Sequence, residues 1–99
     1  MYVALVDFPV TDSAAATAIL QRDAAAARAM AGNLDYRALT DAEDPTRVLI
    51  LHRWTDKAGF DAYLASDLFA EMGGALRALM SGPPVSLRLT AQQDATVNG

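Results

Sequence analysis

The chain contains a single histidine, His52, and a single tryptophan, Trp54, two residues apart. In an extended strand this spacing places both side chains on the same face. An imidazole with an ordinary pKa of about 6.5 is suited to proton abstraction near neutral pH. The indole N–H is a donor suited to a carbonyl or peroxide oxygen. His52 and Trp54 are therefore candidate catalytic residues. The alternatives are a core imidazole bonded to a carboxylate or carbonyl, and a tryptophan that only fills a cavity.

Aromatic and methionine side chains gather in the neighbouring segments, and we expect them to line a small-molecule cavity: Tyr36, Phe60, Tyr63, Phe69 and Met72. A mostly apolar pocket with few polar groups is typical of such sites. For Phe60, Phe69 and Met72 ordinary core packing is the favoured interpretation, because a stripe at helical spacing usually forms core. For Tyr36 and Tyr63 the two interpretations are balanced, because a buried phenol needs a hydrogen-bond partner that a substrate can supply.

The composition argues against several classes of function. Without cysteine there is no disulfide framework, thiolate nucleophile or iron–sulfur cluster. One histidine and no cysteine cannot build a common transition-metal site, and no glycine-rich phosphate loop is present. We therefore expect no metal and no flavin. A net charge of −4 argues against a nucleic-acid partner, including the ferredoxin-like RNA-binding modules.

Hydrophobic patterning predicts four strands and three helices to position these residues. The strands are expected at residues 2–8, 34–40, 47–54 and 85–90, where β-branched and aromatic residues are bounded by turn residues. An alanine-rich helix is expected to start near 11–13, where several side chains can cap it, and to run to 31, ending at Gly32. Two further helices are expected at about 56–64 and 67–80, each preceded by a capping side chain.

This element order predicts an α+β, ferredoxin-like βαββαβ fold, with an antiparallel sheet and helices on one face only. The other sheet face carries residues too apolar to leave in water: Val3, Leu5, Leu49 and Leu51. A second copy facing the first would bury them, so we expect a homodimer. By the same alternation, charged residues that could pair across this interface share the face: Asp7, Asp35, Arg37, Arg53 and Arg88.

Four segments carry a likeness to a known family: residues 2–10, 54–60, 63–69 and 80–85. The first resembles an opening strand, the next two a strand-to-helix signature, and the last a turn into a final strand. Together they resemble the antibiotic-biosynthesis monooxygenase family, small dimeric α+β barrel proteins. The turn at 80–85 is similar to that of the cofactor-free branch acting on aromatic polyketides.

The resemblance implies oxidation of an anthrone or phenol to a quinone by O2, without metal or flavin. A base removes a proton, and the resulting carbanion reduces O2 in a dry pocket; His52 is the candidate base. Tyr63 and Gly73 stand where the haem-degrading branch has tryptophan and histidine, which argues against haem degradation. Phe60 and Ile50 stand where the anthrone-oxidising branch has tyrosine and asparagine, so two polar groups of that site are replaced.

The sequence thus predicts a cofactor-independent monooxygenase acting on an aromatic polyketide-type substrate. The alternative is a non-catalytic dimer of the same fold that binds a hydrophobic small molecule. One domain over residues 1–91 is expected, followed by a polar tail over 92–99. No signal-peptide pattern and no run of about 20 apolar residues is present, so we expect a cytoplasmic protein that does not span a membrane.

Overall fold

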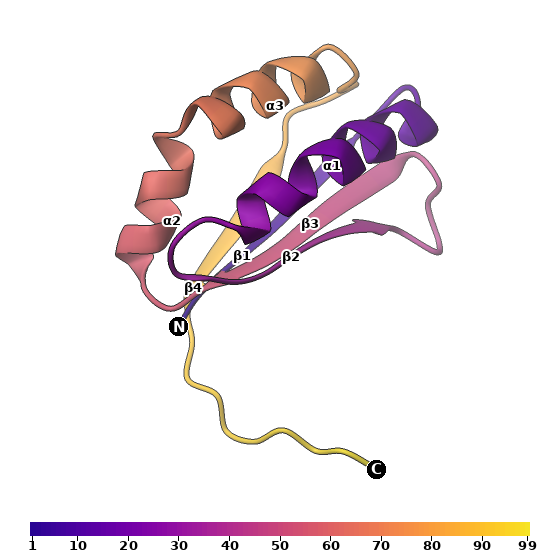
Figure 1. Ribbon diagram of the computed structural model, residues 1–99. Helices are drawn as coiled ribbons and strands as arrows, with labels where there is room; N and C mark the ends of the chain where they lie inside the picture. Colours follow the sequence, from indigo (N-terminus) through magenta and orange to yellow (C-terminus); the bar gives the residue numbers. More distant parts are fainter.

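The computed structural model describes residues 1–99 and contains a four-stranded antiparallel sheet with three helices on one side of it (Figure 1). The strands are β1 (Tyr2–Pro9), β2 (Asn33–Thr40), β3 (Arg47–Trp54) and β4 (Val85–Thr90). The helices are α1 (Ser13–Arg28), α2 (Lys57–Leu64) and α3 (Asp67–Arg77). The spatial strand order is β2-β3-β1-β4, which confirms the ferredoxin-like βαββαβ arrangement. No helix combines the length and hydropathy that crossing a membrane requires.

Each helix begins at the kind of capping residue that the sequence indicates. Asp12 accepts from the Ala15 N–H at 3.0 Å, and Asp56 accepts from the Gly59 N–H at 3.0 Å. Ser66 accepts from the Phe69 N–H at 3.2 Å. These bonds satisfy backbone donors that a first helical turn leaves without partners. The break between α2 and α3 therefore follows from Ser66, whose side chain starts a new helix.

Two helices end three residues earlier than predicted. Helix α1 stops at Arg28, and residues 29–32 form a turn in which Gly32 has a φ of +81° and leads into β2. Glycine adopts this left-handed conformation without steric cost. Helix α3 stops at Arg77, and the next residues bond to the segment directly after β1: the Leu79 carbonyl accepts from the Thr11 N–H, and Met80 forms a bridge with Val10. Competition from this segment thus ends α3.

The sheet register confirms the predicted faces of the first three strands and corrects the fourth. In β3, His52 and Trp54 are buried on the helix side, while Leu49 and Leu51 lie on the helix-free side. The predicted position of Arg88 was wrong, because Arg88 pairs with Ala4, whose side chain is fully buried on the helix side. The predicted alternation failed at β4 because the apolar residues of this strand lie on the helix-free face.

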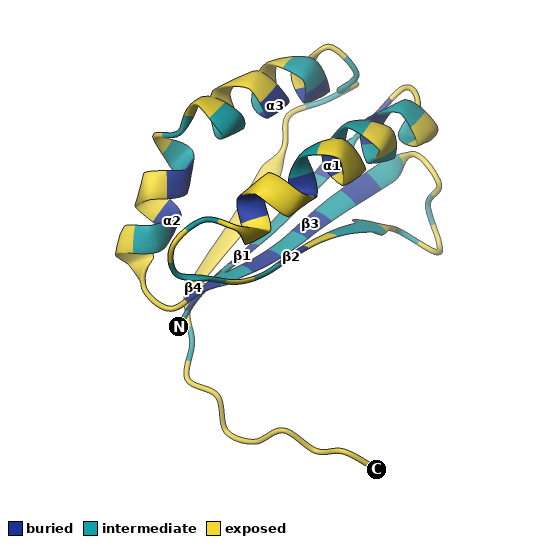
Figure 2. Ribbon diagram, viewed as in Figure 1, coloured by how far each residue is buried: buried dark blue, intermediate teal, exposed yellow.

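Apolar side chains remain exposed on the helix-free face, above all along β4. Val85, Leu87 and Leu89 have 64%, 53% and 45% of their surface exposed. Figure 2 shows β4 exposed along its whole length, in contrast to β1 and β3. Figure 1 shows that residues 91–99 extend away from the sheet without forming a helix or strand. This face thus offers apolar surface that the single chain does not cover.

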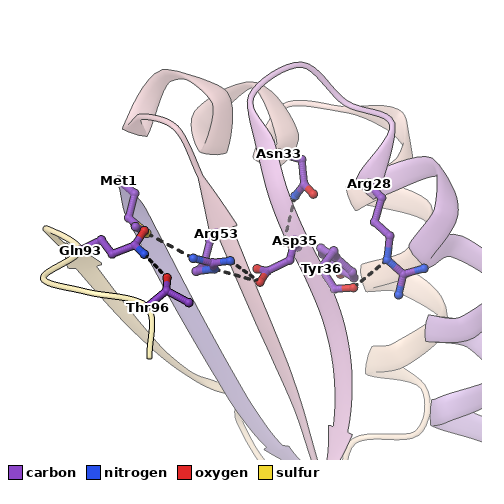
Figure 3. Close-up of polar contacts among 8 residues, drawn as sticks. All are labelled: Met1, Arg28, Asn33, Asp35, Tyr36, Arg53, Gln93 and Thr96. Atoms are coloured by element: carbon purple, nitrogen blue, oxygen red, sulfur yellow. Dashed lines mark hydrogen bonds and ion pairs between the residues drawn. The ribbon is translucent and has the colours of Figure 1, made fainter. Parts of the chain in front are cut away.

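Charged side chains on the helix-free face pair within the chain. Arg53 donates to Asp35 at 2.9 Å and contacts the sulfur of Met1 at 3.7 Å, as Figure 3 shows. Asp7 accepts from Arg47 at 2.8 Å. The Oδ1 atom of Asp35 is buried and has no hydrogen-bond partner. A buried carboxylate oxygen without a donor is energetically costly. The single chain thus leaves one acceptor on this face without a hydrogen-bond donor.

Candidate functional site

A cavity of about 210 Å³ lies between the sheet and the helices α2 and α3. Its walls are mainly apolar, from Val6 and Phe8 on β1, Ile50 on β3, Phe60 on α2, and Phe69 and Leu76 on α3. The polar side chains that line it are His52, Tyr63, Arg77, Ser86 and Arg88. The last three come from the end of α3 and from β4, which is exposed. The cavity thus has a buried end at His52 and an opening toward β4.

Trp54 fixes the hydrogen bonding of His52. The indole N–H of Trp54 donates to Nδ1 of His52 at 2.9 Å, and both side chains are buried. Because an indole nitrogen can only donate, Nδ1 must carry the lone pair. A neutral imidazole in this bond therefore has its proton on Nε2. Trp54 selects the tautomer of His52 that presents an N–H donor from the other side of the ring.

The surroundings of His52 keep its imidazole neutral. Burial and, to a smaller extent, the positive charge of Arg88 lower the pKa of His52 to about 4, against the opposing effect of Asp35. At neutral pH such a histidine is a poor proton acceptor, and its one basic nitrogen already accepts from Trp54. This geometry argues against His52 as a general base. It favours His52 as a preorganised donor to a developing negative charge on oxygen.

The two buried tyrosines, Tyr36 and Tyr63, are each other's hydrogen-bond partners. Their hydroxyl oxygens are 2.9 Å apart, and the Tyr36 hydroxyl also contacts the sulfur of Met72 at 3.6 Å. Burial raises the pKa of Tyr63 to about 12 and raises that of Tyr36 above its usual range. Both phenols are therefore protonated at neutral pH. A substrate is not required to complete their hydrogen bonding.

The structure brings five of the seven predicted site residues to the cavity wall: His52, Phe60, Tyr63, Phe69 and Met72. Trp54 and Tyr36 do not line it, although both were expected there. They lie behind the wall, Trp54 bonded to His52 and Tyr36 bonded to Tyr63. They act on the cavity through these neighbours, so positioning is the role that the geometry supports for them.

Sequence reasoning missed Arg77 and placed Arg88 on the wrong sheet face. The guanidinium of Arg88 lies 5.0 Å from the ring centroid of Phe60, and its Nε donates to the Ser86 hydroxyl at 3.2 Å. The signal that could have found Arg88 is the apolar triplet Val85, Leu87 and Leu89, which alternates with it. Once that triplet is assigned to the helix-free face with Leu5, Arg88 must lie on the cavity side.

No three His, Cys, Asp or Glu side chains lie close enough together to hold a metal ion. The cavity lining contains one such residue, His52, and its Nδ1 is already engaged by Trp54. The chemistry available from these residues is hydrogen-bond donation, anion attraction by the guanidinium groups, and exclusion of water by the aromatic walls.

Comparison with known proteins identifies the family of this chain. Residues 1–74 match the model of the antibiotic biosynthesis monooxygenase family. A Deinococcus radiodurans protein assigned to this family superposes with a TM-score of 0.90 at 20% identity, covering 100% of both chains. A Nitrosomonas europaea protein with the same assignment gives a TM-score of 0.87 at 18% identity, covering 94% of this chain and 100% of the other.

A variant of SnoaB, a cofactor-independent oxygenase from Streptomyces nogalater, gives a TM-score of 0.79 at 26% identity, with 93% of this chain and 94% of the other covered. No curated protein matches significantly. The family match extends over most of the sequence, and it includes the strand with His52 and Trp54, helix α2 and most of α3. The chain belongs to the antibiotic biosynthesis monooxygenase family.

Proposed function

We propose that the protein is a cofactor-independent monooxygenase that oxidises an aromatic polyketide-type substrate, converting an anthrone or phenol to a quinone with O2. The observation that carries this proposal is the neutral imidazole donor at the closed end of an aromatic-walled cavity. The likeness to SnoaB, a cofactor-independent oxygenase, supports the same reaction class.

For an anthrone the reaction balances as substrate plus O2 giving quinone plus water. Loss of a proton from the methylene gives a carbanion whose charge is shared with the carbonyl oxygen. One electron passes to O2, and the resulting superoxide and substrate radical combine at that carbon to form a peroxide. Loss of water leaves a carbonyl, so one oxygen atom enters the product and the other leaves in water. The apolar walls keep water from the radical pair.

His52 stabilises the substrate oxyanion in this scheme. Its Nε2–H points away from the Trp54 bond and donates to the oxygen that gains charge. No lining residue is a carboxylate, and His52 is not basic at neutral pH. The substrate's proton is therefore lost to bulk water before the substrate enters the cavity, which favours phenols and enolisable anthrones that ionise near neutral pH. Trp54 acts as a positioning residue.

Oxygen uptake with dithranol, a hydroxylated anthrone, tests the proposal. Removal of one oxyanion donor typically lowers turnover by about 10²–10³-fold, so we expect this loss in His52→Ala. Trp54→Phe keeps an aromatic ring but frees the imidazole tautomer, and a smaller loss is expected. The wild-type rate should follow ionisation of dithranol, with no separate inflection near the ordinary histidine pKa. Wild-type uptake no faster than the enzyme-free rate would refute the monooxygenase.

No side chain that lines the cavity is suited to accept a proton at neutral pH, and this favours a second candidate function, a non-catalytic protein that binds a hydrophobic small molecule. In that case dithranol or its quinone would bind, with quenching of the Trp54 fluorescence, and O2 consumption would stay at the enzyme-free rate. Measuring binding and uptake on the same preparation separates the two functions.

We also propose that the protein is a homodimer whose helix-free sheet faces pack together. The exposed apolar side chains of β4 and the unpartnered Oδ1 of Asp35 both lie on this side of the sheet. Obligate interfaces of this kind bury on the order of 2,000 Å² or more in total. Light scattering that gave the monomer mass at micromolar concentration would contradict the proposal, and Leu87→Asp is expected to shift the mass toward the monomer.

A further inference from the structure

The rim of the cavity carries two positive charges and no negative one. Arg77, the last residue of α3, and Arg88 on β4 both line the cavity, and none of its lining residues is Asp or Glu. This distribution differs from that of the whole chain, which has 12 acidic and 8 basic residues and a net charge of −4. The cavity is therefore a positively charged site on a negatively charged protein.

Neither rim arginine is neutralised by the chain. The four ion pairs of the structure use other cations: Arg22, Arg47, Arg53 and Lys57. Arg88 is held over the Phe60 ring, and its Nε donates to Ser86, which leaves its terminal nitrogens free. A Cβ atom at Gly73 would lie 3.3 Å from an Nη atom of Arg77, so the glycine gives this guanidinium room.

The rim and the buried end of the cavity belong to one electrostatic site. The Phe60 ring centroid is 5.6 Å from that of His52 and 5.0 Å from the Arg88 guanidinium carbon. The charge of Arg88 also contributes, after burial, to the low pKa of His52. Two positive charges that line one cavity without a counter-ion repel each other, and an anion in the cavity relieves this repulsion.

We propose that the cavity selects aromatic carboxylates, with the carboxylate held by Arg77 and Arg88 at the mouth and the ring directed between the aromatic walls toward His52. Guanidinium groups bind carboxylates through parallel, charge-assisted hydrogen bonds, which a neutral ester cannot form with both oxygens. This inference deepens the proposed function and rests on it only in treating the cavity as the reaction site.

Binding of 6-hydroxy-2-naphthoate tests the inference without any reaction. This fluorescent acid carries a phenol at the end opposite its carboxylate, and its methyl ester is the neutral control. We expect the wild type to bind the acid about 10- to 100-fold more tightly than the ester, which is the usual contribution of a charged hydrogen bond. Arg88→Gln and Arg77→Gln should each remove most of this preference, because they weaken binding of the acid much more than binding of the ester. Arg88→Lys keeps the positive charge but loses the paired N–H donors of the guanidinium, so it should retain part of the preference for the acid.

Arg22→Gln is the matched control, because it makes the same change of charge on the exposed surface of α1, outside the cavity lining. Equal wild-type affinity for acid and ester would overturn the inference, as would failure of both to bind. So would a loss of acid binding in Arg22→Gln as large as in Arg88→Gln. Acid preference without O2 uptake from dithranol would refute the monooxygenase but support this inference. O2 uptake without a preference for the acid would support the monooxygenase and refute this inference.

Discussion

Burial of His52 should make the stability of the fold depend on pH. The pKa of this imidazole falls from 6.5 to about 4 on folding, mainly because burial disfavours the charged form. Between these two pH values the unfolded chain binds a proton that the folded chain does not. The free energy of unfolding therefore keeps its full value above the unfolded pKa and decreases as the pH falls toward the folded one.

The size of the effect follows from the two pKa values. Their difference of about 2.5 corresponds to about 3 kcal/mol, since one unit of pKa is about 1.4 kcal/mol. Most of this loss lies in an accessible pH range, because between about pH 7 and about pH 5 the linkage relation gives a decrease of about 2 kcal/mol. His52→Gln removes the titration, while the glutamine amide can still accept from the Trp54 N–H and donate on its other side.

Urea unfolding of both proteins at pH 7 and pH 5, at one protein concentration, measures the difference. The wild type should lose about 2 kcal/mol more than His52→Gln over this interval. The carboxylates are common to both proteins, so their contributions cancel in the comparison. Parallel losses in the two proteins, or a histidine NMR titration with a pKa near 6.5 in the folded wild type, would refute the reasoning.

Three further substitutions test the fold around the site, each by urea unfolding against the wild type. Tyr36→Phe leaves the buried Tyr63 hydroxyl without its 2.9 Å partner and should cost about 1–3 kcal/mol, and a cost below 0.5 kcal/mol would show that the pair is unimportant. Gly32→Ala forces a side chain into a φ of +81°, with its Cβ 3.1 Å from the Thr55 hydroxyl, and should cost at least about 1 kcal/mol; an unchanged midpoint would contradict this. Asp56→Ala removes the cap of α2 and should cost about 1 kcal/mol, whereas Asp56→Asn should largely restore the wild-type value.

Local signals were enough to predict most of the fold. Capping by Asp12, Asp56 and Ser66 depends on residues within three positions of each helix start, and such short-range bonds can be inferred from sequence. The strand pairs follow from alternation and from a polar turn between β2 and β3. The helix ends were less predictable. Helix α3 stops where Leu79 and Met80 bond to the segment after β1, about 70 residues earlier in the chain, and this contact has no local signal.

The candidate site was predicted less completely, for two physical reasons. Side chains on one strand face share a direction. The spacing of His52 and Trp54 does not reveal that Trp54 donates to His52 and lies behind it, away from the cavity. The usual rule that the apolar side of a strand faces the helices failed for β4, because both faces of this sheet carry apolar residues. That error removed Arg88 from the expected site. Sequence periodicity cannot distinguish an apolar strand face that packs against the helices from one that lies on the helix-free side of the sheet.

The closed end and the mouth of the cavity are formed by parts of the chain that differ in how well they tolerate substitution. His52 and the helices α2 and α3 that cover it supply the closed end, where Trp54 and Tyr63 are buried and substitutions are costly for folding. Ser86 and Arg88 at the mouth lie on β4, an exposed edge strand beyond residues 1–74 that match the family model. Exposed positions usually tolerate replacement with little loss of stability. Evolution can therefore change which ligand enters while preserving the donor that acts on it, so relatives with the same interior are expected to diverge in specificity at the mouth first.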